Sequence, residues 1–317
     1  MLVTIALLAA LGSAQVAEPA EHIAAEAAAG QEAVEAAADH AEGAAAEEHG
    51  FDILHHIQDA REIELPFGAV IHLPPAGSWQ VGPVDMTPTK HVVFLWLAGL
   101  LTLLLFIPAA RMAKRSHERS PSGGHNALEA LVIYLRNEVV VRNIGRGGEK
   151  FAPFVITLFF FILIANLLGL LPYGASSTGN VSVTAALALM TFAVTEVTGM
   201  RTLGAKGYTN TIIFVPPGLP WPMAAAIALI MTPVELISKF TKPFALTIRL
   251  FANMTAGHVL LLAIISLIFL FGSYAIAIGP VLMAIALTFL ELFVSFLQAY
   301  IFALLSAVFI GLIRHAH

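Results

Sequence analysis

The sequence predicts an all-α integral membrane protein. We expect about five membrane helices, the last two forming a long tilted hairpin, plus one interfacial amphipathic helix. Of the 317 residues, 58% are hydrophobic and only 12% are charged, which is outside the range of soluble domains. Several apolar runs also reach the roughly 20 residues that a helix needs to cross the hydrocarbon core. The chain has no cysteine, so disulfides and thiolate metal sites are excluded.

The charges are unevenly distributed along the chain and predict its orientation. Residues 1–89 hold fourteen of the 21 acidic residues and a single basic one, Arg61. Residues 111–150 hold eight of the 16 Lys and Arg residues. Because short basic loops stay in the cytoplasm, this stretch is expected inside and the acidic N-terminus outside. Counting spans then places the C-terminus in the cytoplasm.

The region before the first span divides into two parts. Residues 1–17 contain a short apolar run ending in small residues, which is typical of a possible signal peptide. Residues 18–89 form an acidic, Ala/Glu-rich region that we expect in the periplasm, with low complexity at its start and several prolines near its end. The remaining residues, 90–317, form the predicted membrane domain.

Three spans and one amphipathic helix are expected in the first part of this domain. The spans cover Val92–Ala110, Phe151–Leu171 and Val181–Met200, each an apolar run closed by a basic residue or a proline. Residues 126–145 differ, because apolar residues recur there at helical spacing with charged residues between them. We expect this helix to lie at the membrane surface.

Two longer helical stretches follow a proline-rich connector at residues 207–222. They run from about Met223 to Phe271 and from about Ile276 to Leu312. At about 1.5 Å per residue, each exceeds the ~30 Å hydrocarbon core, so each must tilt, bend or begin outside it. Pro233 and Pro243 are natural places for the first of them to bend.

The polar residues of this hairpin predict which side chains face each other. Arg249 and Gln298 are nearly equidistant from a turn near position 274, and so are His258 and Glu291. The two costliest polar pairs therefore fall opposite each other in an antiparallel hairpin. A carboxylate and an imidazole, with ordinary pKa values near ~4.3 and ~6.5, can together exchange protons near neutrality. The alternative for His258 and Glu291 is a buried ion pair that holds the hairpin together.

Arg249 is the least expected residue in this part of the chain. An arginine at mid-membrane costs about 2.5 to 3.5 kcal/mol on translocon scales, and a guanidinium cannot lose its proton to avoid that cost. It could snorkel to the interface or form an internal salt bridge. It could also be a fixed positive charge beside an ion path, which would lower the pKa of a carboxylate brought past it. Gln298 favours the last interpretation, because an amide can orient the guanidinium without neutralising it.

Four further polar residues lie in or near the spans, and each has two interpretations. Glu235 suits a carboxylate on an exit path, or a solvated residue near Lys239. Asn166 and Asn253 could bind water in a half-channel, or could hold helices together. Glu196 lies near the predicted end of its span, where we expect it to snorkel to the interface rather than to relay protons.

Several motifs resemble one family closely. These are Pro233-Val-Glu-Leu-Ile-Ser-Lys, Lys242-Pro-Phe-Ala-Leu-Thr-Ile-Arg-Leu-Phe-Ala-Asn-Met-Thr-Ala-Gly-His, Leu297-Gln-Ala-Tyr-Ile-Phe and Phe161-Ile-Leu-Ile-Ala-Asn-Leu-Leu-Gly-Leu-Leu-Pro. Together they are similar to subunit a of the membrane sector of the rotary F-type ATP synthase. The resemblance covers about residues 90–315. Where familiar bacterial members carry Glu and then His in the outer channel, this chain has His258 and then Glu291.

The resemblance implies a proton-conducting stator subunit that is not itself catalytic. It implies two aqueous half-channels separated by an essential arginine, Arg249, which faces the carboxylates of the c-ring. It assigns further positions in proton translocation to Gln298, His258, Glu291, Asn253, Glu235 and Asn166. Its implied partners are the c-ring, the peripheral-stalk subunit b, other ATP synthase subunits and membrane lipids. The implied location is the bacterial inner membrane.

An alternative from another class is a proton-coupled secondary transporter that works within one polypeptide. Such folds usually contain inverted repeats, and no repeat relates the halves of this sequence. No cofactor-binding, nucleotide-binding or metalloprotease motif is present in the sequence, and nothing in it indicates binding of nucleic acid. We therefore expect no cofactor and no metal.

Overall fold

The computed structural model describes residues 62–64, 70–75, 77–81, 84–85, 87–115, 124–171, 174–213, 220–271 and 274–315. The possible signal peptide at residues 1–17 and most of the acidic region at 18–89 lie outside these residues. Residues Thr255–Ile285 belong to one compact unit, and residues Gln58–Met254 and Ala286–His317 belong to another.

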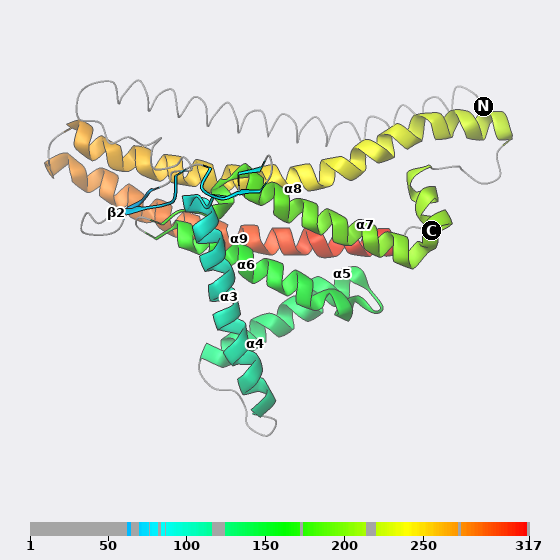
Figure 1. The fold of residues 1–317 in the computed structure, drawn as a ribbon, viewed down its shortest axis with the longest axis horizontal. Coiled ribbons are helices and arrows are strands. Elements are labelled where there is room, and N and C mark those ends of the chain that lie inside the picture. The colour runs from blue at the N-terminus through cyan, green and yellow to red at the C-terminus, as the bar shows by residue number, and fades with distance from the viewer. Residues whose placement is uncertain are drawn as a thin grey trace. The chain divides into compact units, whose positions relative to one another are not determined.

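Most of the described chain is helical (Figure 1). Among the described residues, five helices are long and apolar enough to cross a membrane, which confirms the predicted all-α integral membrane fold. The helices are α3 (Lys90–Arg115), α4 (Gly124–Tyr134), the π-helical η2 (Leu135–Val141), α5 (Arg142–Ile144), the 3₁₀ turn η3 (Gly148–Phe151), α6 (Ala152–Gly169), the 3₁₀ turn η4 (Ser177–Gly179), α7 (Val181–Ile212), α8 (Trp221–Phe271) and α9 (Tyr274–Arg314). The five candidate spans are Lys90–Arg111, Gly148–Gly169, Val181–Gly204, Trp221–Ile268 and Ala277–Arg314.

Two short β-hairpins precede the first span. Strand β1 (Glu62–Glu64) pairs antiparallel with β2 (Val70–His72), with Ile63 opposite Ile71. Strand β3 (Gln80–Val81) pairs antiparallel with β4 (Val84–Asp85). The sequence predicts an extramembrane segment here but does not predict these strands. β-Branched residues between turn-forming prolines and glycines favour such short extended pairs.

Helix α6 lies at the centre of the larger unit. Its Phe159 is fully buried and makes edge-to-face contacts with Phe160 and with Phe296 of α9, at ring-centroid distances of 5.0 and 5.5 Å. Phe160 in turn contacts Phe106 of α3 at 4.9 Å. Helix α3 crosses α6 at a steep angle (Figure 1). Since lipid tails are as apolar as these side chains, close van der Waals packing rather than burial from water holds the helices together.

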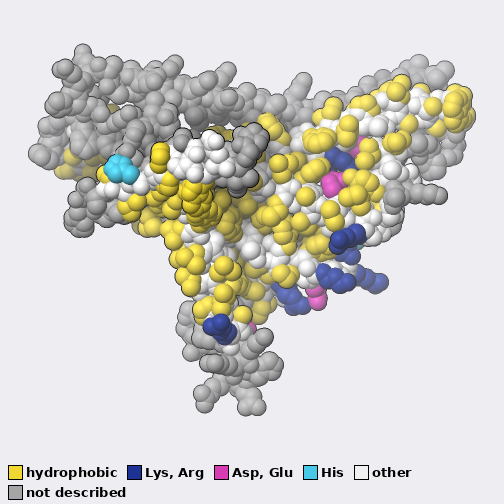
Figure 2. All heavy atoms as spheres, viewed as in Figure 1, with side chains coloured by type: hydrophobic (Ala, Val, Ile, Leu, Met, Phe, Trp, Pro, Cys, Tyr) yellow, Lys and Arg dark blue, Asp and Glu magenta, His cyan; other side chains and the backbone are white. Residues whose placement is uncertain are grey.

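The predicted amphipathic helix is a continuous helical stretch, α4–η2–α5, that ends at Gly145. Its apolar residues Leu135, Val139, Val140 and Ile144 are fully buried in the core formed with α6 and α9. The charged residues between them are exposed, and Figure 2 shows basic side chains gathered beside α5. The amphipathic pattern is therefore confirmed, and its apolar stripe is used for packing against the spans.

Helix α7 is longer than predicted. It continues past Met200 to Ile212, with a non-helical Gly204 at φ 70° and ψ 172° between its two parts. A positive φ suits glycine, which has no Cβ to clash in that conformation. The chain changes direction at Gly204, and the segment that follows brings Tyr208 against Glu196. The predicted connector at residues 207–222 is therefore helical in its first part, up to Ile212.

The last two helices have the lengths that the sequence predicts. Helix α8 has 51 residues with Pro233 and Pro243 inside it, and α9 has 41 residues. These lengths correspond to about 75 Å and about 60 Å, far more than the ~30 Å hydrocarbon core. Helix α8 changes direction between its yellow-green start and its yellow middle in Figure 1, the stretch that contains both prolines.

Candidate functional site

Arg249 lies on an exposed face of α8. The adjacent Leu250 is fully buried and Leu246, one turn earlier, is 4% exposed, so Arg249 lies at the edge of the packed face, on the exposed side of the helix. Asn253 and Ala256, at one and two helical turns from Arg249, are also exposed. Within the part of the chain that the structure describes, the guanidinium of Arg249 forms no ion pair and no hydrogen bond. The internal salt bridge considered for this residue is therefore not present among the described residues.

Gln298 is 3% exposed and bonds to a different partner than predicted. Its Oε1 accepts a hydrogen bond from Nδ2 of Asn253 at 2.9 Å. The expected contact between the amide oxygen of Gln298 and Arg249 is thus replaced by one with the residue a turn further along α8. The reason is that Gln298 lies on the packed side of α9, next to the fully buried Ala299, whereas the arginine points outward.

Asn166 is fully buried and connects three elements. Its Oδ1 accepts a hydrogen bond of 2.6 Å from Oγ1 of Thr178, and its Nδ2 donates to the backbone carbonyl of Ser295 in α9 at 3.4 Å. Thr178 also shares a 2.7 Å hydrogen bond with the hydroxyl of Ser176. Asn166 therefore joins α6 to η4 and α9, and Asn253 likewise joins α8 to α9. Both asparagines hold helices together, which was one of their two predicted roles.

The sequence interpretation missed the hydroxyl groups around Asn166. Ser177, Thr178 and Ser295 are fully buried, and the hydroxyls of Ser177 and Ser295 have no hydrogen-bond partner in the described ranges. A signal was present, because Ser176-Ser177-Thr178 follows a helix-ending proline and comes just before the next span. Buried hydroxyls beside an amide form a locally polar region inside an apolar bundle.

His258 and Glu291 occupy half-buried positions on α8 and α9. His258 belongs to the compact unit that contains Thr255–Ile285, and Glu291 belongs to the other unit. Their pairing therefore stays a prediction.

We expected Glu196 to snorkel to the interface, but its side chain is instead directed into the protein. Its carboxylate accepts a hydrogen bond from the hydroxyl of Tyr208 and forms an ion pair with Lys239 of α8, with Nζ 3.1 Å from Oε2. The side chains of Lys239 and Glu196 are only 9% and 13% exposed. The longer α7 explains the difference, because Glu196 lies well before the end of the helix. Removing one partner of a buried ion pair typically costs about 3–5 kcal/mol, so this contact connects α7 firmly to α8.

Tyr208 lies beyond the candidate span of α7 and supports this ion pair. Burial, together with the hydrogen bond to Glu196 and its negative charge, raises the pKa of Tyr208 to about 12. The phenol therefore stays protonated and remains a hydrogen-bond donor at physiological pH. The Nζ atom of Lys239 lies 4.5 Å from the centre of its ring, a cation–π contact.

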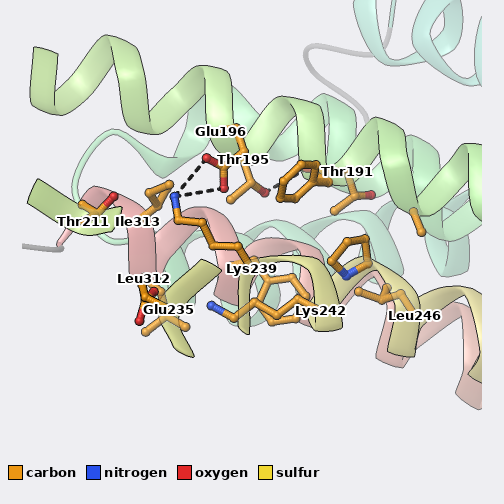
Figure 3. A pocket seen from close by; sticks show the side chains of 14 residues that line it. Thr191, Thr195, Glu196, Thr211, Glu235, Lys239, Lys242, Leu246, Leu312 and Ile313 are labelled. Atoms are coloured by element: carbon orange, nitrogen blue, oxygen red, sulfur yellow. Dashed lines mark hydrogen bonds and ion pairs between the residues drawn. The ribbon is translucent and has the colours of Figure 1, made fainter. Parts of the chain in front are cut away.

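This ion pair lines a pocket of about 130 Å³ within the larger unit (Figure 3). Helix α7 contributes Thr191, Thr195 and Glu196, helix α8 contributes Glu235, Lys239 and Lys242, and α9 contributes apolar side chains. Glu235 is half-buried and forms no ion pair with any described residue. The predicted exit-path residue thus lines a hollow that contains charged groups. No set of three His, Cys, Asp or Glu side chains suited to a metal ion occurs among the described residues.

The fold and the site define a class of protein: an all-α, multi-pass membrane protein in which an exposed arginine, without an ion pair among the described residues, lies within a long candidate span and beside buried polar groups. Comparison with known proteins gives the family. The sequence model of the family described as ATP synthase A chain matches residues 92–311. The chain belongs to this family.

Relatives with similar sequences carry the same family name. The chain is 45% identical over 263 residues to ATP synthase subunit a of Chloroherpeton thalassium, covering 82% of this chain and 76% of the relative. It is also 45% identical over 284 residues to ATP synthase subunit a 2 of Chlorobaculum tepidum, covering 87% and 78% of the two chains. With ATP synthase subunit a of Anaeromyxobacter dehalogenans strain 2CP-C, the identity is 45% over 303 residues, covering 90% and 77%. The resemblance noted from the motifs is thereby confirmed.

Proposed function

We propose that this chain is the proton-conducting stator subunit of a rotary ATP synthase in a bacterial inner membrane. In this role it provides two aqueous half-channels, and Arg249 separates them while facing the carboxylates of a c-ring. The chain itself does not make ATP. Its other partners are the peripheral-stalk subunit b, the remaining subunits of the complex and the surrounding lipids, and its N-terminus lies in the periplasm and its C-terminus in the cytoplasm.

The observation that carries this proposal is the environment of Arg249. A guanidinium on the outer face of an apolar helix, without an ion pair among the described residues, needs a counter-charge from another molecule or from water. Alanines at positions 245 and 252 lie about one helical turn before and after it, so a second helix can approach closely. A carboxylate on that second helix would lose its proton beside Arg249 and recover one elsewhere.

The proposed path uses the polar residues on both sides of this arginine. Protons would pass inward near Asn166, Asn253, His258 and Glu291, with Gln298 holding Asn253 in place through their 2.9 Å hydrogen bond. They would load a carboxylate of the rotor and, after nearly a full rotation, leave past Glu235 toward the cytoplasm. Each proton that crosses releases about 2.3 kcal/mol per 100 mV of membrane potential.

The test is the replacement Arg249→Ala, measured in membrane vesicles that carry the assembled complex. We expect ATP-driven proton pumping to be abolished while the chain still inserts into the membrane and assembles, because the fixed charge is lost but no packed side chain is removed. Arg201→Ala is the matched control, since Arg201 is an exposed arginine of α7 remote in sequence from this site, and it should pump normally. Normal pumping by Arg249→Ala would refute the proposal.

A further inference from the structure

The pocket between α7, α8 and α9 contains two carboxylates and two ammonium groups. Within the described residues, one carboxylate and one ammonium group form an ion pair with each other. Glu196 pairs with Lys239 at 3.1 Å. Glu235 and Lys242 also line the pocket, and neither forms an ion pair with a described residue. Figure 3 shows the Lys239 ammonium directed toward Glu196, with Glu235 on the other side of the pocket.

The pairing of Lys239 with Glu196 is not the one that the geometry of a single helix favours. Glu235 lies four residues before Lys239 on the same helix, and a glutamate four residues N-terminal to a lysine is the favourable arrangement for an ion pair along a helix. Lys239 nevertheless extends across to α7. There it contacts the carboxylate of Glu196 and the ring of Tyr208, whose hydroxyl donates to the same carboxylate.

We propose that Glu196 is a positioning residue for Glu235, because it holds the Lys239 ammonium at α7 and so leaves the Glu235 carboxylate without an ion pair. The inference rests on the proposed function, in which Glu235 lies on the proton exit path. A carboxylate that is paired with an ammonium must give up that contact before it can take a proton. Glu196 therefore keeps the exit carboxylate available for proton relay without touching the proton itself.

Among the residues that line the pocket, Lys239 is the cation that pairs with Glu196. From α9 the pocket is lined by Phe309, Leu312 and Ile313, none of which titrates. Lys242, on the same helix as Glu235, directs its Nζ over the ring of Phe309 at 5.6 Å from the centroid. From α7, the titratable groups are Glu196, which lines the pocket, and Tyr208, which is bonded to it.

Passive proton flux through the assembled complex, measured in vesicles across a range of pH, tests this inference. Glu196→Gln keeps the shape of the side chain and can still accept the hydrogen bond from Tyr208, but it releases Lys239. We expect the freed ammonium to pair with Glu235, so that the pH of half-maximal flux moves about one unit lower. Adding Lys239→Gln removes the freed cation, and the double variant should regain the wild-type pH profile.

A purely structural role for the ion pair predicts a different pattern. It predicts that Glu196→Gln lowers the amount of complex without shifting the pH profile, and that adding Lys239→Gln restores the amount of complex, because no buried charge is then left unpaired, again with an unchanged profile. An unshifted pH profile in Glu196→Gln overturns the inference. If Glu196→Gln assembles poorly, Glu196→Asp replaces it, because this variant keeps the charge on a shorter side chain. We expect a smaller downward shift of the pH profile, again reversed by Lys239→Gln. The absence of a shift would count against the inference.

Two controls separate this inference from the proposed function. Glu138→Gln breaks an exposed ion pair with Arg142, of 2.8 Å, and should leave both flux and pH profile unchanged. Glu235→Gln tests the exit path directly. If it conducts with the wild-type profile, the exit role and this inference are both wrong, while the role of Arg249 stands. If Glu235→Gln fails to conduct and Glu196→Gln behaves as wild type, only this inference is wrong.

Discussion

Single residues in this chain differ mainly in whether their polar groups are satisfied inside the protein. Asn166 and Gln298 are buried and hydrogen-bonded to neighbouring elements. Arg249 is exposed and unpaired among the described residues, so its charge is directed outward. In a low-dielectric surrounding, buried amides stabilise a helix bundle when they are hydrogen-bonded. A guanidinium that points outward instead interacts electrostatically with charged groups of a neighbouring molecule.

Asn166→Leu is expected to destabilise the protein at this scale. The replacement removes both hydrogen bonds of the Asn166 side chain, so the hydroxyl of Thr178 keeps only its bond to Ser176 and the carbonyl of Ser295 loses its side-chain donor. An unsatisfied buried polar group costs about 1–3 kcal/mol, so the thermal midpoint of the purified chain in detergent should fall clearly. Asn137→Leu, at an exposed position of η2, is the control and should change little. Equal midpoints for both variants would show that the Asn166 contacts do not contribute to stability.

At the scale of elements, the end of α9 comes very close to α5, which the sequence did not predict. A Cβ atom added at Gly311 would lie 2.1 Å from the backbone oxygen of Asn143. Beside it, Arg314 donates a 2.7 Å hydrogen bond to the backbone oxygen of Arg146. The glycine thus allows the end of α9 to lie directly against the backbone of the amphipathic helix.

Gly311→Ala should therefore force α9 away from α5. Overpacking of this kind usually costs about 1–3 kcal/mol, because backbone atoms must move to accept the methyl group. The measurement is the thermal midpoint of the purified chain, together with the yield of assembled complex. Gly279→Ala, in the same helix but with no atom within 4 Å of the added Cβ, is the matched control and should be neutral or slightly stabilising. A neutral Gly311→Ala would contradict the close contact.

At the scale of the whole molecule, the distribution of charge and the order of the spans together imply one orientation. The exposed basic residues beside α5 follow the first span along the chain, and the strands precede it (Figure 1). Because α3 contains the single candidate span among the described residues between these two regions, they should lie on opposite sides of the membrane. By the positive-inside rule, we expect the basic side in the cytoplasm.

Single cysteines test this orientation cleanly, since the chain has none of its own. A membrane-impermeant maleimide should label Ser78→Cys in cells with a permeable outer membrane, and should label Glu149→Cys only after the inner membrane is opened. Both positions are exposed, so a difference in labelling reports the side of the membrane and not burial. The reverse pattern would invert the proposed topology and place Glu235 on the periplasmic side.

The sequence by itself determined the class of fold, the five spans and the family. Span-length apolar runs have few alternatives in a bilayer, where backbone polar groups must be satisfied within helices, and the motif around Arg249 identified the family. The tertiary structure decided which polar groups meet. Gln298 bonds to Asn253 rather than to Arg249, and Lys239 to Glu196 rather than to Glu235. These choices depend on offsets of one helical turn and on the break at Gly204, which are set by packing between helices and not by spacing along one of them.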